Sequence, residues 1–213
     1  MLKLASYTKS EMTEIFKTKN MQGLQRKLQR IGVSFKVTGK GDNAIFTITN
    51  IENPFKIYCM TELGFDGRSD FYKIRNFYYY YFNDEEFRSM PNEVQENRMR
   101  LEHKYISRQT IANYINKLCK KNFVTKNNSY IYYFAHKNNQ RIVEKKEYCE
   151  AWHMYWSDIG KGYTSRDAIY NMIRNYGGVA RKQEIAEING IYNKDIELLR
   201  NLIQEDMEKE LSE

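Results

Sequence analysis

Polar side chains suited to nucleic-acid recognition recur on one face of the segment from residue 106 to residue 134. Glutamine and asparagine hydrogen-bond to adenine, arginine to guanine and lysine to phosphate. On the opposite face Ile111, Ile115 and Leu118 recur at i, i+4 and i+7, and Ser107 can cap the N-terminus. The spacing predicts a helix that buries one stripe and presents another. The polar face comprises Arg108, Gln109, Asn113, Asn116 and Lys117.

Two β-rich runs follow this helix, which we expect to end at Asn122. Residues 123–125 and 130–134 are rich in β-branched and aromatic side chains, and residues 126–129 between them favour a turn. The pattern predicts a short hairpin with Lys126 in its basic tip. Helix and hairpin together would form a recognition helix with a two-stranded wing.

The same order of parts is predicted for residues 8–51. Thr8 and Glu11 have the spacing of a capping box, which opens a helix through about Lys17. A second helix follows a turn at residues 18–20, and it buries Leu24, Leu28 and Ile31. Its polar face comprises Gln22, Gln25, Arg26, Gln29 and Arg30.

A wing is predicted after this second helix as well. Residues 34–37 and 44–48 are alternating strand runs, and Gly39 and Gly41 in the intervening turn permit positive φ angles. Lys36 and Lys40 lie in this hairpin. The parts are again helix, turn, helix and wing.

This order of parts resembles the winged helix-turn-helix superfamily, over roughly residues 1–52 and again over roughly residues 66–136. The pattern is similar to tandem winged helix-turn-helix DNA-binding proteins of Gram-positive phages, plasmids and other mobile elements. The resemblance implies an α+β fold, mostly α, with two winged helix-turn-helix modules and small β-hairpin wings. We expect modules at residues 1–52 and 53–137, followed by a helical interaction region at residues 138–213.

Between the modules, residues 53–70 read as a connection with a short strand at residues 55–59. Residues 71–83 predict a helix full of aromatic side chains, and Pro91 suits the start of the next helix, from Asn92 to about His103. The tyrosines of residues 71–83 could stack on unpaired bases. We favour the alternative, a core stripe of Phe71, Ile74, Tyr78 and Phe82, because helical spacing explains it.

The C-terminal region predicts helices. Trp152 and Trp156 lie four residues apart in a helix at residues 148–157, where they would anchor the segment. Residues 183–203 have the spacing of a helix-turn-helix without a wing, with Gly190 in the turn. Their exposed side chains are nearly neutral and an acidic run follows, which favours helical pairing or partner docking over DNA contact.

The net charge of +7 is unevenly distributed. Residues 1–137 contain 23 lysine and arginine residues against 13 aspartate and glutamate residues, whereas residues 138–213 contain 11 against 14. From Arg98 to Lys137 nine residues are basic and one, Glu102, is acidic. A polyanion is the natural partner for this distribution.

The sequence lacks the residue combinations that form common catalytic sites. His103, His136 and His153 form no metal-binding pair, and Glu144 with Lys146 has no strand-borne aspartate before it, so a nuclease site is not supported. There is no phosphate-binding glycine loop and no nucleophile elbow. We therefore expect no catalysis, no metal and no cofactor.

Three widely spaced cysteines predict reduced and mostly buried thiols, since no CxxC pair is present. No apolar run has the length of a membrane span, and the N-terminus lacks a signal-peptide core. The expected location is the cytoplasm.

The leading hypothesis is a non-catalytic, sequence-specific double-stranded DNA-binding protein, acting as a transcription regulator or replication-origin binder. The alternative is a mobile-element protein that binds and inhibits a host protein, as anti-CRISPR proteins do, and uses its helix-turn-helix parts for autoregulation or as a scaffold. Residues 139–213 would then hold the host protein or form a homodimer. The expected DNA contacts are Gln22, Gln25, Arg26, Gln29, Lys36, Lys40, Arg108, Gln109, Asn113, Lys117, Lys120, Lys121 and Lys126.

Overall fold

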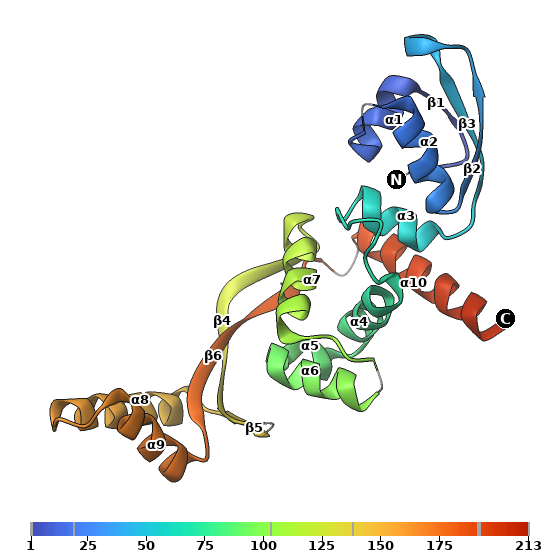
Figure 1. Ribbon diagram of the computed structural model, residues 1–213. Coiled ribbons are helices and arrows are strands. Elements are labelled where there is room, and N and C mark those ends of the chain that lie inside the picture. Colours follow the sequence, from blue (N-terminus) through green and yellow to red (C-terminus); the bar gives the residue numbers. More distant parts are fainter. Residues whose placement is uncertain (1, 19, 103, 138, 191–192, 213) are drawn as a thin grey trace. The chain divides into compact units, whose positions relative to one another are not determined.

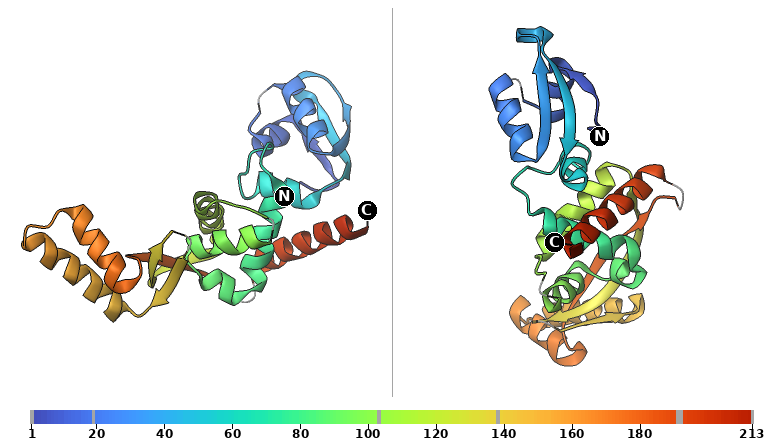
Figure 2. Two further views of the ribbon diagram at one scale, coloured as in Figure 1. Left: turned by 60° about the horizontal axis from the view of Figure 1, so that its bottom comes forward. Right: turned by 90° about the vertical axis from the view of Figure 1, so that its right-hand side faces the viewer.

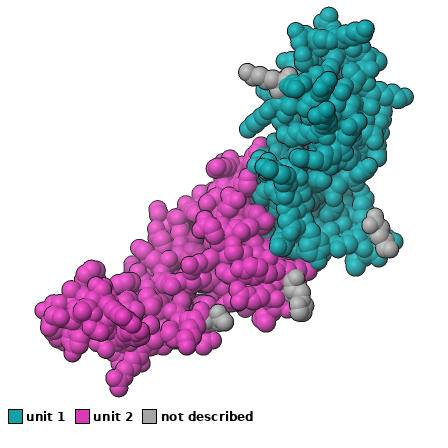
Figure 3. Space-filling model, viewed as in Figure 1, with its two compact units in different colours: residues 1–79, 190–213 teal, residues 80–189 magenta. Residues whose placement is uncertain are grey.

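The computed structural model describes residues 2–18, 20–102, 104–137, 139–190 and 193–212. The chain is α+β and mostly helical, with two three-stranded antiparallel sheets (Figure 1). It divides into two compact units, residues 1–79 with 190–213 and residues 80–189 (Figure 3). The boundaries predicted at residues 52 and 137 both fall within a unit. The last helix of the chain belongs to the first unit.

The first unit begins with two helices and a hairpin in the predicted order. Strand β1 (Ser6–Thr8) leads into α1 (Lys9–Phe16) and α2 (Met21–Arg30). The capping box is confirmed, because the Thr8 hydroxyl accepts the Glu11 N–H at 3.3 Å and the Glu11 carboxylate accepts the Thr8 N–H at 2.7 Å. Both helices therefore start where the local sequence predicts.

A three-stranded sheet covers one side of these two helices (Figure 1). Strands β2 (Val33–Thr38) and β3 (Ile45–Ile51) form the predicted hairpin, with a short 3-10 turn, η1 (Gly41–Asn43), between them. Strand β1, which the sequence does not predict, pairs with β3 and gives the order β1-β3-β2. The core lies between sheet and helices and comprises Met12, Phe16, Leu24, Leu28, Ile31, Phe46 and Ile48.

The strand predicted at residues 55–59 is wrong, because this segment forms α3 (Pro54–Thr61). Local capping explains the difference. Asn53 accepts the backbone N–H of Lys56 at 2.7 Å, and Pro54 has the fixed φ angle that suits the first helical position. Phe55, Ile57, Tyr58 and Cys59 are all buried, so the apolar run reflects burial around the helix.

Helix α10 (Lys194–Ser212) packs against α3 and completes the first unit. Arg75 of α4 (Phe71–Asn83) is buried and donates to the Asp206 carboxylate at 3.0 Å and to the Asp206 backbone carbonyl at 3.2 Å. Arg75 also pairs with Glu210, and the Asn53 amide donates to Asp206 at 2.6 Å. A hydrogen-bonded ion pair therefore fastens α10 to the unit.

Helix α4 has the bounds that the sequence predicts, and Ile74, Tyr78 and Phe82 are buried as expected, whereas Phe71, the fourth residue of the predicted stripe, is half-buried. Most of its other rings are covered as well. Tyr72, at 46% exposed, is the one aromatic side chain of α4 with a largely open surface. The helix is thus a core element, and it buries more rings than the preferred interpretation predicts, since Phe77 and Tyr81 lie outside the predicted stripe.

The second unit contains three short helices before its sheet, α5 (Glu85–Ser89), α6 (Asn92–Leu101) and α7 (Arg108–Lys120). The end expected for α6 near His103 lies outside the described residues. The Ser107 hydroxyl accepts the Thr110 N–H at 3.3 Å, and the predicted stripe of Ile111, Ile115 and Leu118 is buried. Helix α7 therefore forms as its capping and periodicity indicate.

The hairpin predicted at residues 123–134 is wrong. Both runs belong to one strand, β4 (Val124–His136), which pairs with β6 (Val179–Ile188) on either side of a bulge between Lys126 and Tyr130. Asn128 has a φ angle of 57°, and Glu184 and Glu187 of β6 accept hydrogen bonds from Asn128 and Asn127. The four turn-like residues therefore stay beside β6 and do not reverse the chain.

The helix-turn-helix predicted at residues 183–203 is also corrected. Residues 183–188 lie in β6, paired with β4, and only the segment from Lys194 onward is helical. Its helix-forming residues are overridden by backbone pairing with a neighbouring strand. Residues 138–213 are therefore not uniformly helical, because they also contain β5 (Asn139–Val143).

A helical hairpin separates β5 from β6. Helices α8 (Lys145–Gly160) and α9 (Ser165–Tyr176) pack together beside one end of the β4–β6 ribbon (Figures 1 and 2). Phe134, Ala151, Met172 and Ala180 form their shared core. The sheet order is β5-β4-β6, so the strand that completes the ribbon follows the hairpin in the sequence.

Candidate nucleic-acid interface

The outward face of α2 is polar and contains no acidic residue. Gln22, Arg26 and Gln29 are exposed at i, i+4 and i+7, opposite the buried Leu24 and Leu28. The remaining predicted contact on this helix, Gln25, is half-buried at the side of the stripe. The helix therefore presents two carboxamides and one guanidinium to solvent in a single row.

The hairpin after α2 adds two exposed lysines. Lys36 lies opposite Thr47 on the outer face of the sheet, and Lys40 lies in the turn. Lys9 donates to Asp42 at 2.7 Å, and this ammonium group holds the pKa of the Asp42 carboxyl below its ordinary value. Lys40, by contrast, forms no ion pair with any residue that the structure describes. Its charge stays available to an anion.

The exposed row of α7 consists mainly of amide side chains, more so than the contacts expected from the sequence. Gln109, Asn113, Asn116 and Lys120 are exposed at i, i+4, i+7 and i+11, directly opposite the buried stripe. Asn116 is absent from the expected contacts although it lies at their centre. Predicted contacts at the sides are Lys117, which is half-buried, and Lys121, which is exposed.

Arg108 does not lie free at the N-terminus of α7. Its guanidinium pairs with Glu93 of α6, and Arg181 of β6 pairs with the same carboxylate. The backbone N–H of Arg108 donates to Glu96 at 3.0 Å. The Glu96 carboxylate thus occupies the N-terminus of the helix, where a phosphate would otherwise bind, and Glu93 neutralises the Arg108 side chain. The pKa of Tyr133 is raised by burial and by Glu93 beside it.

Lys126 is exposed, but it does not form a wing tip. It lies in the β4 bulge next to β6, where Glu184 and Glu187 are the hydrogen-bond acceptors for the neighbouring asparagines. These carboxylates partly neutralise the predicted basic tip. In place of the predicted second hairpin the structure has the β4–β6 ribbon, with residues 137–178 inserted between its strands.

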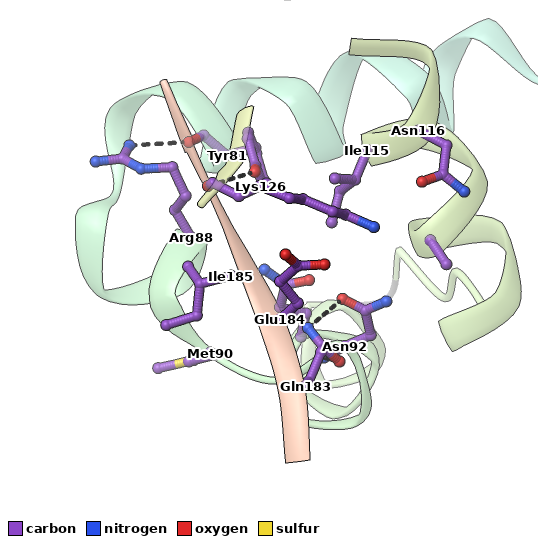
Figure 4. Close-up of a pocket in the computed structure, with 13 residues that line it drawn as sticks. Tyr81, Arg88, Met90, Asn92, Ile115, Asn116, Lys126, Gln183, Glu184 and Ile185 are labelled. Atoms are coloured by element: carbon purple, nitrogen blue, oxygen red, sulfur yellow. Dashed lines mark hydrogen bonds between the residues drawn. The ribbon is translucent and has the colours of Figure 1, made fainter. Parts of the chain in front are cut away.

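Behind α7 lies a polar pocket of about 130 Å³ within the second unit (Figure 4). Asn92 and Gln183 form one wall through reciprocal hydrogen bonds of 2.9 Å. Gln95 donates to the Phe87 carbonyl at 2.8 Å, while its buried amide oxygen has no hydrogen-bond partner among the described residues. Asn116 also lines this pocket, so one carboxamide of the outward stripe borders the space behind the helix.

Two parts of the chain combine a pair of helices with a pair of antiparallel strands: α1, α2, β2 and β3 in the first unit, and α6, α7, β4 and β6 in the second. We call them the two helix-and-ribbon parts, and both end with the same kind of backbone hydrogen bond. The N–H of Glu52, just after β3, donates to the Gly32 carbonyl at 2.9 Å. The N–H of Asn189, just after β6, donates to the Phe123 carbonyl at 2.9 Å. In each part the chain leaving the second strand is thus bonded to the residues that connect the helix to the first strand.

Other chemistry is limited in the described part of the chain. It contains no group of three or more histidine, cysteine, aspartate or glutamate side chains that could hold a metal ion. Its helices do not combine the length and apolar character that membrane crossing requires. The three cysteines form no disulfide in this part of the chain, and Cys149 is exposed, against the expectation that the cysteines are mostly buried. Burial raises the pKa of the half-buried Cys119 thiol.

The faces of α2 and α7 therefore define the candidate site by their geometry and chemistry. Both present a row that combines carboxamides with a basic residue, Arg26 within the row of α2 and Lys120 at the end of the row of α7, and neither helix contains an acidic residue. No protein-family model, curated protein or solved structure shows significant similarity to the chain.

Proposed function

We propose that this protein binds double-stranded DNA with sequence preference and without catalysis, as a transcription regulator or replication-origin binder. One observation supports the proposal above all. Two helices, α2 and α7, each follow a shorter helix, present an outward carboxamide row and lead into an antiparallel strand pair. This is the order of a winged helix-turn-helix, whose second helix enters the major groove.

The proposed base contacts are the side chains of the two outward rows. Glutamine and asparagine can each make two hydrogen bonds to the adenine edge, and arginine can do so to guanine. In the first part these residues are Gln22, Arg26 and Gln29. In the second part they are Gln109, Asn113 and Asn116, with Lys120 and Lys121 as phosphate contacts.

Arg108 and Lys126 become less favoured contacts than the sequence suggests. A guanidinium that already pairs with Glu93 must lose that partner before it can bind a base, and the exchange gains little free energy. Lys126 lies on a surface that it shares with two glutamates. We therefore assign sequence preference in α7 to its amides.

A selection of bound fragments from genomic DNA, performed with the full-length protein, tests this function. Enrichment of defined sites is expected, and Asn113→Ala should relax the preferred sequence. Asn201→Ala is the matched control, since it removes an exposed helical asparagine from α10. A selection without enriched sites, or equal effects of both substitutions, would refute the proposal.

A second candidate function is host-protein binding through residues 139–213. Trp156 of α8 is 64% exposed, and an exposed indole of this size is typical of protein interfaces. Under this proposal Trp156→Ala abolishes capture of one defined host protein by the full-length chain, whereas Asn113→Ala does not. Identical captured proteins for wild type and Trp156→Ala would exclude this role for Trp156.

A further inference from the structure

The outward face of α9 combines free cations with open aromatic rings. Arg166, Tyr170 and Arg174 recur at i, i+4 and i+8, so they are neighbours on one side of the helix. Tyr170 is 57% exposed, and Tyr163 in the preceding loop is 51% exposed. Lys161 in that loop is exposed as well. We call these five residues the α9 patch.

Free arginines are unusual in the second unit. Arg166 and Arg174 form no ion pair with a described residue, and the one carboxylate within the α9 segment, Asp167, accepts the Thr164 hydroxyl at 2.6 Å. Most other arginines of this unit have a carboxylate partner. These pairs are Arg98 with Asp84, Arg100 with Glu96, Arg108 and Arg181 with Glu93, and Arg141 with Glu147.

The aromatic rings of the patch are suited to stacking. The Arg166 guanidinium lies over the Tyr170 ring, 5.6 Å from its centre, so a planar cation and a ring already form one stacked pair. Exposed tyrosine rings next to unpaired basic groups are the elements with which proteins bind unpaired bases and their phosphates. A duplex offers such rings no base face, because its bases are stacked within the helix.

The charge of this segment also differs from that of its surroundings. Residues 161–176 contain Lys161, Arg166 and Arg174 against Asp167 alone. The excess of acidic residues in the C-terminal region lies elsewhere, mainly in residues 205–213, which contain five acidic residues and one basic residue. Residues 138–213 therefore have a net negative charge as a whole, although residues 161–176 within them are basic.

We infer that the α9 patch is a binding site for single-stranded nucleic acid. Its arginines and lysine pair with phosphates, and Tyr163 and Tyr170 stack on unpaired bases. The site is distinct from the proposed duplex contacts of α2 and α7 and does not depend on them. DNA and RNA strands share the recognised chemistry, and the test separates them.

Fluorescence anisotropy of the full-length protein with labelled oligothymidylate and oligouridylate of about 15 nucleotides tests the inference. Arg166→Glu combined with Arg174→Glu should weaken binding at least about tenfold, since two phosphate contacts become repulsive. Lys145→Glu combined with Lys146→Glu on α8 is the matched control, because it makes the same charge change at two exposed residues. This control should change affinity by no more than about threefold.

Base stacking on Tyr170 can be tested separately from the phosphate contacts. Tyr170→Leu should weaken oligonucleotide binding several-fold while the dependence on salt stays unchanged, whereas Tyr170→Phe should bind as wild type does. Circular dichroism verifies that the variants are folded. Tighter binding of oligothymidylate than of oligouridylate would assign the site to DNA, and the opposite order would assign it to RNA.

Two results would overturn the inference. One is an absence of oligonucleotide binding at low salt, and the other is equal weakening by the α9 and α8 charge reversals. The duplex proposal is tested separately with the same proteins. The α9 variant should retain duplex binding, and Asn113→Ala should retain oligonucleotide binding, so failure of one activity leaves the other interpretable.

Discussion

Gly32 and Asn122 occupy the same position in the two helix-and-ribbon parts of this chain. Each is the second residue after its helix ends, and each has a left-handed backbone, with φ angles of 76° and 61°. The N–H of each donates to the carbonyl three residues earlier, Gly32 to Gln29 at 3.1 Å and Asn122 to Cys119 at 3.0 Å. Asparagine is among the few residues other than glycine that tolerate this conformation.

The first prediction follows from this backbone conformation. Asn122→Val should destabilise the second unit by roughly 1–2 kcal/mol, because a β-branched residue is strained at positive φ, whereas Asn122→Gly should change stability by less than about 0.5 kcal/mol. Both tryptophans of the chain, Trp152 and Trp156, lie in the second unit, so urea unfolding followed by fluorescence measures its stability. Equal stabilities of the two variants would contradict the prediction.

The second prediction concerns the carboxylate that holds Arg108. Glu93→Gln leaves Arg108 and Arg181 without their shared anion, so the second unit should lose roughly 1–3 kcal/mol of stability. The released guanidinium should strengthen duplex binding and steepen its dependence on salt by about one ion. Glu102→Gln removes one negative charge from the end of the same helix and is the control. Equal gains in affinity for both variants would show that only net charge matters.

The third prediction concerns the attachment of α10. Asp206→Asn should weaken the contact with the buried Arg75 by roughly 2–4 kcal/mol, since a buried guanidinium then lacks its main anion. Glu210 pairs with the same guanidinium but is half exposed, so Glu210→Gln should cost at most about 1 kcal/mol. Hydrogen exchange of α10 amides measures both effects. Faster exchange in Glu210→Gln than in Asp206→Asn would reverse the assignment.

The fourth prediction is a pH dependence. The backbone N–H and hydroxyl of Thr8 lower the pKa of the Glu11 carboxyl from its ordinary value of 4.5. The unfolded chain therefore binds this proton more readily, and the capping box stabilises the fold above the ordinary pKa and is lost as pH falls through the lowered one. The melting temperature should fall less steeply in Glu11→Gln than in wild type between about pH 6 and pH 3. Identical slopes would exclude the capping box as a source of acid sensitivity.

Local elements of this fold were predictable where neighbouring residues determine them. The Thr8 and Ser107 caps, the stripe of Leu24 and Leu28 and the bounds of α4 all follow from interactions within a few residues. The first hairpin was predictable for the same reason, since Gly39 and Gly41 permit its tight turn.

Pairings between distant segments were not predictable. Strand β4 pairs with β6, whose first residue comes 43 residues after the last residue of β4, and no local pattern indicates that partner. The site shows the same limit. Arg108 has the residue type and exposure of a base contact. Its guanidinium is paired with Glu93, which Arg181 shares, and these two residues come from two other elements.

The order of the units along the chain sets an order for folding during synthesis. A chain that leaves the ribosome N-terminus first releases all of residues 80–189 before α10 exists. Arg75 then lacks its ion-pair partners Asp206 and Glu210, and the surface of α3 that α10 later covers is exposed to solvent. The inserted unit can therefore mature first, while the unit that starts the chain is the last to be completed.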